Sequence, residues 1–328
     1  MRIDPHVHCR DGNQAYKTTI AQILAIAKAQ GVDVIIDMPN TEPPIIGYSD
    51  VQQRLLLVPS SGKGKYFLYV GLTADPKQIL EATNCCQCFQ EVIGLKMFAG
   101  RSVGPLAVIE DEKQKEVYKM LVRLGYKGVL AVHCEREADM KPELWNPCQP
   151  TSHSLARPKE AEINSVRNQI DFAKEAGFTG TLHICHVSCP ETVDLIVQAR
   201  EIFKGQMEIT CGITPHHLLF STKDQEQSGP MGIFFKVNPP LRQEDDVVAL
   251  LGRLRGGDIN WIETDHAPHS LDEKFLPPYL SGIPSFYFYE HLIKRLSSDM
   301  KVPLSLIEAM TCKNIIRAFS PKLDHLAM

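Results

Sequence analysis

The sequence predicts an α/β protein built as a (β/α)8 barrel, the TIM-barrel fold. Two observations predict it. Eight strand-like runs alternate along the chain with eight amphipathic helical runs, and the strand-like runs are rich in Val and Ile, as in a parallel sheet that is covered on both faces. The 328 residues suffice for eight such units and a large core. We expect residues 1–328 to form one barrel domain, with an open, doubly wound sheet as the alternative.

The first unit is a strand near residues 3–8, followed by the helical pattern "TTIAQILAIAKAQG". This pattern ends at Gly31, a residue type favoured just past a helix end. The other expected strands cover 32–39, 65–72, 92–98, 128–135, 180–188, 207–213 and 259–266. The helices that follow them are expected at 49–58, 76–83, 110–125, 159–176, 190–203, 244–257 and 285–297.

Three further segments lie outside these units. The segment 303–319 is expected to form a terminal helix that packs on the outside of the barrel. Two longer connections, 136–157 and 267–285, are richer in Pro, Ser and other polar residues than their flanks, and we interpret them as loops.

Charge and hydropathy exclude several classes of partner. The formal net charge of -4 is spread along the chain without a basic block, so we expect no nucleic-acid partner. No apolar run approaches the roughly 20 residues needed to span a bilayer, and the amino terminus lacks a signal-peptide pattern. We therefore expect no membrane association and a cytoplasmic location. The ten cysteines agree with this, because several lie in apolar runs where a reduced thiol packs as a small hydrophobe.

The "CCQC" stretch places Cys85, Cys86 and Cys88 together. A metal site is one interpretation, but the cluster lacks a spaced second pair of ligands. We therefore interpret it as a helix end that carries reduced thiols.

Polar side chains concentrate where the expected strands end, and this is where (β/α)8 barrels place their active sites. The residues at or near these ends are His6, His8, Asn40, Lys96, His133, His183, His186, Asp265 and His269. One histidine in an apolar run is more often a hydrogen-bonded core residue than a ligand. Several histidines with a carboxylate at one open site, however, suit zinc or a related divalent ion that carries out hydrolysis.

Two local patterns refine this hypothesis. In "DPHVHCRDG", His6, His8 and Arg10 follow each other at intervals of two, so on an extended strand all three project from one face. Lys96 is the unusual member, because an ammonium group repels a metal ion. It fits such a site only if its surroundings deprotonate it or if it is converted into an anion.

Eight stretches, "DPHVHCRDG", "DMPNT", "GLKMF", "AVHCE", "HICHVS", "TPHHLLF", "KVNPPLR" and "TDHAPH", resemble the motif series of the dihydroorotases, a family of the amidohydrolase superfamily. The resemblance runs nearly end to end. It implies a barrel that binds two divalent metal ions, expected to be zinc. The metal ligands that it implies are His6, His8, Lys96, His133, His186 and Asp265.

The resemblance also implies roles for these ligands. His6 and His8 match the ligands of the more buried ion, and His133 and His186 match those of the second. Lys96 matches a lysine that reacts with carbon dioxide to form a carbamate bridging both ions. Asp265 matches the catalytic aspartate, which binds the first ion and shuttles the proton. His183, His216 and His217 match no ligand, and we interpret His183 as a supporting or core residue.

Substrate recognition is implied in the same way. The expected reaction is the reversible cyclisation of N-carbamoyl-L-aspartate to L-dihydroorotate in pyrimidine biosynthesis. Arg10 and Asn40 match the pair that binds the substrate carboxylate, a role that suits a guanidinium and a neutral donor. His269 and Asn238 match further substrate contacts. Gly282 is expected to offer backbone groups to the ring, although its loop spacing differs from the family pattern.

Alternative functions share parts of this site. A cyclic amidase of the hydantoinase, dihydropyrimidinase or allantoinase type would share the metal centre but would not need Arg10 and Asn40 arranged for a carboxylate. A non-catalytic scaffold would be expected to lack metal ligands, and a metal-storage protein would need no carboxylate clamp. Many relatives add a small β-sandwich for which this chain has no room, so we expect a short form. Its barrel flank would be covered by a second copy, as a homodimer, or by an aspartate transcarbamoylase.

Overall fold

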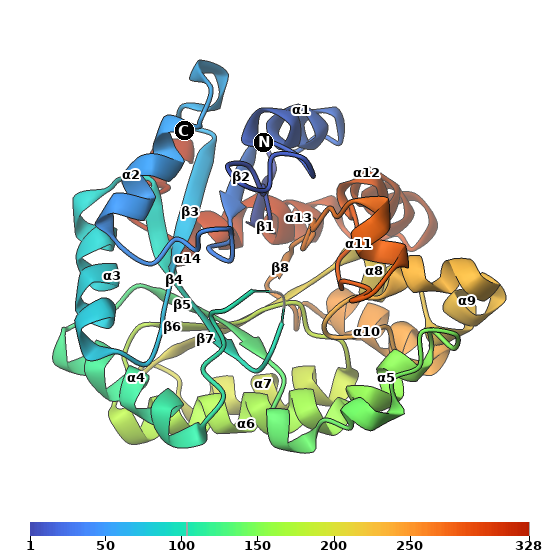
Figure 1. Ribbon diagram of the computed structural model, residues 1–328. Coiled ribbons are helices and arrows are strands. Elements are labelled where there is room, and N and C mark those ends of the chain that lie inside the picture. Colours follow the sequence, from blue (N-terminus) through green and yellow to red (C-terminus); the bar gives the residue numbers. More distant parts are fainter. Residues whose placement is uncertain (103, 328) are drawn as a thin grey trace.

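The computed structural model describes residues 1–102 and 104–327. Within them, eight parallel strands form one sheet in sequence order. The strands are β1 (Ile3–Val7), β2 (Val34–Asp37), β3 (Tyr66–Gly71), β4 (Val92–Ala99), β5 (Val129–Cys134), β6 (Thr181–Ile184), β7 (Glu208–Ile213) and β8 (Trp261–Ile262). The chain after β8 returns to β1, where His8 N donates to His266 O at 2.9 Å. The sheet therefore closes as the predicted (β/α)8 barrel, and the consecutive strand order excludes the doubly wound alternative (Figure 1).

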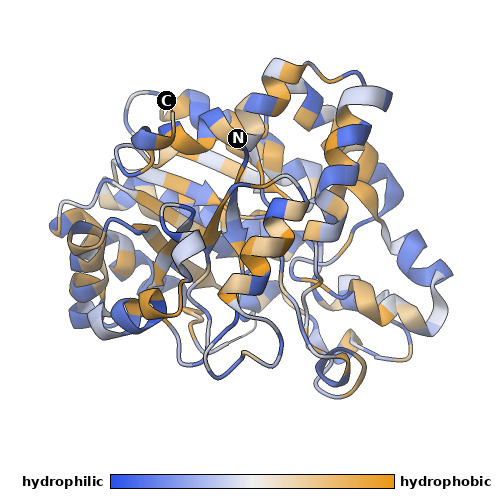
Figure 2. Cartoon of the chain, turned by 90° about the horizontal axis from the view of Figure 1, so that it is seen from above, coloured by the Kyte–Doolittle hydropathy of each residue, from blue (hydrophilic) through white to orange (hydrophobic). Residues whose placement is uncertain are grey.

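A ring of helices surrounds the barrel (Figure 1). The long helices are α1 (Ile20–Ala29), α2 (Tyr48–Leu56), α3 (Pro76–Cys88), α4 (Asp111–Arg123), α6 (Lys159–Ala176), α7 (Pro190–Ile202), α10 (Glu244–Gly256) and α12 (Phe286–Lys294). Local sequence sets their ends. Thr19 caps α1 by accepting a hydrogen bond from Gln22 N at 3.3 Å, and Gly177 ends α6 in the left-handed conformation. Figure 2 shows these helices banded in orange and blue, as expected of helices with one buried face.

Shorter helices occupy the connections. The two long connections, interpreted above as loops, contain α5 (Ser152–Ala156) and α11 (Leu271–Phe275) respectively. The other short helices are α8 (Pro215–Leu219), α9 (Thr222–Gln227), α13 (Leu304–Glu308) and α14 (Asn314–Ala318). The tighter 3-10 turns are Ser60–Gly62, Glu137–Asp139, Pro142–Leu144, Gly229–Phe235 and Asp324–Leu326, and the π-helical turns are Arg295–Asp299 and Ala309–Lys313.

Two layers of core hold the barrel. The larger layer lies between the strands and the surrounding helices. The second fills the amino end of the barrel, where Ile3, Phe67 and Trp261, near the starts of their strands, pack with Ile315 and Phe319 of the C-terminal segment. This segment, expected as one helix, consists of α13, a π-helical turn and α14. On this packing we propose that the chain forms one catalytic domain.

Replacing Phe319 with alanine is expected to lower the free energy of unfolding by about 3 to 5 kcal/mol. The ring is 2% exposed, and its centroid lies 6.1 Å from those of both Tyr69 and Trp261, so the substitution leaves a cavity. Urea denaturation measures the loss. Leu304→Ala is the control, because Leu304 is 75% exposed and its loss should change stability by less than about 0.5 kcal/mol. An equal loss of unfolding free energy in the two variants would contradict this account of the core at the amino end of the barrel.

Two strands end earlier than expected. β6 ends at Ile184 and β8 at Ile262, whereas strands were expected to reach 188 and 266. The cause is the backbone of two candidate ligands, because His186 and Asp265 have φ of 37° and 48°, outside the extended region. Past β8 the Asp4 carboxylate accepts hydrogen bonds from Thr264 N and Thr264 Oγ1 at 3.1 and 2.5 Å. These bonds add to the backbone hydrogen bond from Asp265 N to His6 O at 3.0 Å, which keeps this segment beside β1.

No helix within residues 1–102 and 104–327 is long and apolar enough to cross a membrane. All ten cysteines are free thiols, and those of the "CCQC" cluster lie at the carboxyl end of α3.

Candidate active site

A small pocket opens at the carboxyl ends of the strands. The predicted site residues that line it are His6, His8, Arg10, Asn40, His133, His186, Asn238, Asp265 and Gly282. Phe98, Ser102, Ala267 and Ser281 complete its wall. Two predicted residues lie behind the wall, Lys96 beneath Phe98 and His269 beside Arg10. Side chains from opposite ends of the sequence therefore meet at one mouth, as the barrel geometry predicts.

The first cluster in the pocket consists of His6, His8 and Asp265. Asp265 Oδ1 lies 2.9 Å from His8 Nε2 and 3.3 Å from His6 Nε2. One donor atom from each residue lies within 4.8 Å of the others. The alternation of β1 directs both imidazoles to the same face, and the left-handed backbone of Asp265 turns its carboxylate toward them.

The second cluster is a pair of histidines. His133 Nδ1 and His186 Nε2 face each other at 3.2 Å, and the rings of His6 and His186, 5.1 Å apart, connect the two clusters. Two nitrogens bound at 2.0–2.1 Å to a tetrahedral ion would be about 3.3 Å apart. The observed spacings in both clusters fit this value. The donor set therefore fits divalent metal ions.

Lys96 lies under both clusters. It is fully buried, its Nζ contacts Cys185 Sγ at 3.0 Å, and it lies 5.0 Å from the centre of the Phe98 ring. Burial, together with the charge of Lys96, lowers the pKa of His6 to about 4. Burial and Lys96 also lower the pKa of His133. These imidazoles are therefore neutral near pH 7, which is the form that binds metal ions.

The electrostatics of Asp265 differ from those of the histidines. Burial alone would raise the pKa of Asp265, but the hydrogen bond from His8 and the electrostatic attraction to the His6 and His8 rings hold it well below its ordinary value. The carboxylate is therefore ionised and can accept a proton or bind a cation.

Glu263 is a supporting residue that the sequence did not reveal. Its carboxylate accepts hydrogen bonds from His183 Nε2 at 3.0 Å, Trp261 Nε1 at 2.9 Å and His186 N at 2.6 Å, and it lies 3.4 Å from His6 Nδ1. Glu263 thereby helps to hold two predicted ligands, His186 and His6, in position.

The space for Glu263 exists because residue 212 is glycine. A Cβ at Gly212 would lie 2.3 Å from the carboxyl carbon of Glu263. The signal available in the sequence was the position of Glu263 just after the apolar run of β8 and two residues before Asp265. The glycine opposite Glu263 could not be paired with it from sequence alone. His183 belongs to this supporting layer, since it bonds Thr210 and Glu263.

Arg10 enters the pocket from a left-handed turn after β1, with φ of 60°. Its Nε donates to Pro268 O at 3.2 Å, and its Nη2 lies 3.2 Å from His269 Nε2. Burial lowers the pKa of Arg10 to about 10 and that of His269 to about 3. At neutral pH the site therefore presents one buried cation beside a neutral imidazole, an arrangement that suits a carboxylate.

Asn238 and Gly282 also line the pocket. Asn238 Oδ1 lies 2.9 Å from Nε2 of His153, which belongs to α5 in the 136–157 connection and was not predicted as a site residue. Gly282 has φ of 132°, and a Cβ there would lie 2.8 Å from Ala267 O and 3.0 Å from His269 Nε2. Only glycine lets the backbone approach the pocket this closely.

His216 and His217 are buried near the site but do not line the pocket. His216 Nδ1 lies 2.9 Å from Ser285 Oγ, and His217 Nε2 lies 3.0 Å from Pro239 O. Both therefore connect loops of the mouth.

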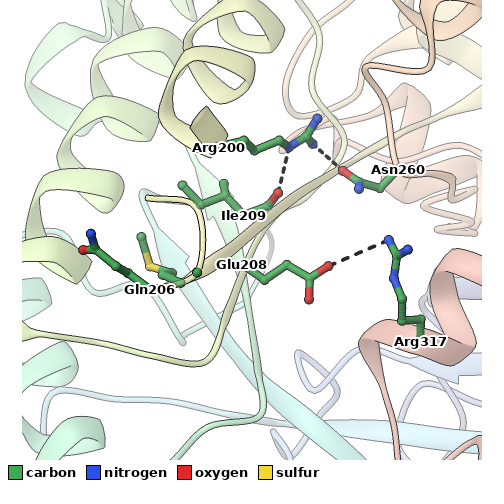
Figure 3. Close-up of a pocket in the computed structure, with 8 residues that line it drawn as sticks. Arg200, Gln206, Glu208, Ile209, Asn260 and Arg317 are labelled. Carbon is green, nitrogen blue, oxygen red and sulfur yellow. Dashed lines mark hydrogen bonds and ion pairs between the residues drawn. The ribbon is translucent and has the colours of Figure 1, made fainter. Parts of the chain in front are cut away.

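A different pocket lies at the amino end of β7 (Figure 3). Its Arg200 is occupied by hydrogen bonds to Ile209 O and Asn260 Oδ1, and its Arg317 lies 4.0 Å from Glu208. None of the predicted site residues lines it, so the pocket at the carboxyl ends is the candidate active site.

Comparison with known proteins agrees with this geometry. No family model matches the chain. A dihydroorotase of Brevibacillus brevis is 30% identical over 327 residues, which cover 95% of this chain and 71% of that protein. A dihydroorotase of Methanosarcina mazei is 29% identical over 326 residues, covering 97% and 69%. The L-hydantoinase (dihydropyrimidinase) of Arthrobacter aurescens has a similar fold, with a TM-score of 0.84 at 23% identity over 98% of this chain and 71% of that one. The chain therefore belongs to the dihydroorotase family of metal-dependent cyclic amidohydrolases.

Proposed function

We propose that this chain is a dihydroorotase, which interconverts N-carbamoyl-L-aspartate and L-dihydroorotate at the pocket described above. The observation that carries the proposal is the meeting of two metal-ligand clusters with a buried arginine in one small pocket. The clusters account for amide chemistry, and the arginine accounts for a substrate that carries a carboxylate. Relatives named dihydroorotase that align over nearly the whole chain support the same function.

We propose that His6, His8 and Asp265 hold one divalent ion and that His133 and His186 hold the other. A carbamate on Lys96 would bridge them, and zinc is the proposed ion. When bound, such ions activate water near neutral pH and polarise an amide carbonyl. Two findings support a conversion of Lys96: its amine is fully buried, and that amine donates its hydrogen bond to the thiol of Cys185 rather than to a carboxylate.

The chain's own groups move the proton and orient the ring. In the hydrolytic direction, the ionised Asp265 accepts the proton of the attacking water and returns it to the leaving ring nitrogen. In the cyclising direction the carbamoyl nitrogen bonds to the side-chain carboxyl carbon, and the same carboxylate of Asp265 takes the proton from that nitrogen and passes it to the leaving oxygen, which departs as water. Asn238 and Gly282, which line the pocket, hold the ring.

Replacing Arg10 with methionine is expected to raise KM for dihydroorotate by about tenfold to hundredfold, because a charge-assisted hydrogen bond is worth about 1.5–3 kcal/mol. The metal ligands remain, so kcat should fall much less. Steady-state kinetics in both directions measure the split. Arg101→Met is the control, since the Arg101 side chain is 71% exposed. A KM for the Arg10 variant within about twofold of the control would show that Arg10 does not bind the carboxylate.

A substrate panel tests the proposed function as a whole. The similarity to a hydantoinase structure makes neutral cyclic amides the main competitors, so purified protein is assayed with dihydroorotate, hydantoin, dihydrouracil and allantoin. We expect dihydroorotate to have the highest kcat/KM. A preference for a neutral ring would replace this proposal by the hydantoinase-type alternative.

Location and assembly remain proposals. The ten free cysteines favour a reducing compartment, and we propose the cytoplasm. Association with a second copy or with an aspartate transcarbamoylase stays a prediction, which sedimentation of the purified protein, alone and mixed with that enzyme, would test.

A further inference from the structure

We propose that Lys236 and Lys274 are positioning residues that hold the segment 276–282, here called the mouth loop, against the active-site pocket. The proposal rests on the proposed function, because it assigns the two lysines a part in binding the substrate. It arises from an unusual feature of the structure: two buried ammonium groups whose hydrogen bonds go to backbone carbonyls and a hydroxyl rather than to carboxylates.

Lys274 extends from α11 into the base of the mouth loop. Its side chain is buried, and its Nζ donates to Lys236 O at 2.7 Å, Gly282 O at 2.7 Å and Leu280 O at 3.3 Å. An ammonium group has three N–H donors, so all three are used. Within residues 1–102 and 104–327, no carboxylate oxygen forms an ion pair with this amine. The amine of Lys274 therefore links the backbone at Lys236 to the mouth loop by hydrogen bonds.

The side chain of Lys236 also forms hydrogen bonds with the mouth loop. Its Nζ donates to Tyr279 O at 2.8 Å and to Ser281 Oγ at 3.1 Å, and it lies 5.0 Å from the centre of the Trp145 ring, a favourable cation–π contact. The backbone of Lys236 accepts a further hydrogen bond from Gly282 N at 2.9 Å. The two lysines thus contact four consecutive residues of the mouth loop.

The held loop connects directly to the substrate-binding groups. Ser281 and Gly282 line the pocket, and Ser281 O lies 3.0 Å from His269 Nε2, which lies 3.2 Å from the Arg10 guanidinium. Without the lysines, the half-buried carbonyls of Tyr279 and Leu280 and the buried carbonyl of Gly282 would lose these donors, and a buried unpaired acceptor is costly. The loop would then move away and release His269 and Arg10 from their binding geometry.

The charge of the pair suits the proposed substrate. Burial, together with the charge of Arg157, lowers the pKa of Lys236 to about 8. Burial and the Lys236 charge lower the pKa of Lys274. An anionic substrate in the adjacent pocket opposes both shifts, because a nearby negative charge favours the protonated amines. A carboxylate substrate and an ordered mouth loop should therefore stabilise each other.

The experiment compares Lys274→Met and Lys236→Met with Lys223→Met. Methionine keeps most of the apolar length and removes the donors. Lys223 is the matched control because its side chain is 59% exposed and pairs with Glu244 on the surface. Each protein is measured for metal content, for KM and kcat with dihydroorotate, and for hydrogen exchange of the amides of the mouth loop without substrate.

We expect KM to rise about tenfold or more in both variants, with kcat within about threefold and unchanged metal content, since the lost hydrogen bonds cost roughly 1–3 kcal/mol. Mouth-loop amides should exchange faster than in the control.

Faster exchange with an unchanged KM would mean that the lysines are only structural and would overturn the proposal. A KM and an exchange rate that both match the control would also overturn it. If Lys274→Met does not fold, Lys236→Met decides. Failure of the unmodified protein to use dihydroorotate would overturn the proposed function instead, while hydrogen exchange would still test the attachment of the loop.

Discussion

Replacing Asp265 with asparagine is expected to lower kcat by about a thousandfold or more, because the variant loses the group that accepts and returns the proton. Asparagine keeps the shape of the side chain, and its carbonyl oxygen can still face His8, which now lies 2.9 Å from Asp265 Oδ1. It cannot accept a proton at neutral pH. Single-turnover and steady-state assays of dihydroorotate hydrolysis measure the loss.

Two controls separate proton transfer from folding and metal loss. Asp272→Asn changes an exposed carboxylate on α11 only seven residues away, and its activity should match that of the unmodified protein. Metal content is determined for both variants, because Asp265 is also a proposed ligand. An Asp265 variant that keeps its ions and a kcat within about tenfold of the unmodified protein would remove this residue from the mechanism.

Replacing Lys96 with alanine is expected to abolish activity together with metal binding. Lys96 is fully buried near both clusters, since its charge acts on His6, His133 and His186, and a carbamate on its amine would supply the anionic group between the two ions. A short carboxylic acid such as acetate or propionate can enter the space that the side chain leaves and supply a carboxylate in its place. Millimolar carboxylic acid should therefore restore part of the activity and of the bound metal.

Lys127→Ala, which removes an exposed lysine just before β5, is the control and should keep its metal with or without added acid. Elemental analysis after gel filtration gives the metal content. A Lys96 variant with full metal content and no response to carboxylic acids would contradict the carbamate bridge. Mass spectrometry of the unmodified protein under native conditions adds a direct readout of the carbon dioxide adduct.

The sequence predicted most of the barrel because parallel strands leave a strong signal. β4 and β5, whose residues are all buried, read as continuous apolar runs. The positions of His6 and His8 followed from the alternation of an extended strand, and Lys96 and His133 from their places near strand ends. Because these patterns are local, they can be recognised in the sequence without knowledge of the fold.

The supporting residues could not be predicted because their partners are distant in sequence. Glu263 braces the site only because residue 212, on the neighbouring strand, is a glycine that leaves room for it. Lys274 holds the mouth loop through a carbonyl of Lys236, 38 residues away. The early ends of β6 and β8 depend on left-handed backbones at His186 and Asp265, for which these residue types give no warning.

The most direct test of the account is a crystal structure of the zinc-loaded protein with anomalous diffraction recorded at the zinc edge. The account predicts two peaks roughly 3.5–4 Å apart, one beside His6, His8 and Asp265 and the other beside His133 and His186, with added density on Lys96 Nζ between them. Peaks elsewhere on the chain, or none at these five side chains, would contradict it.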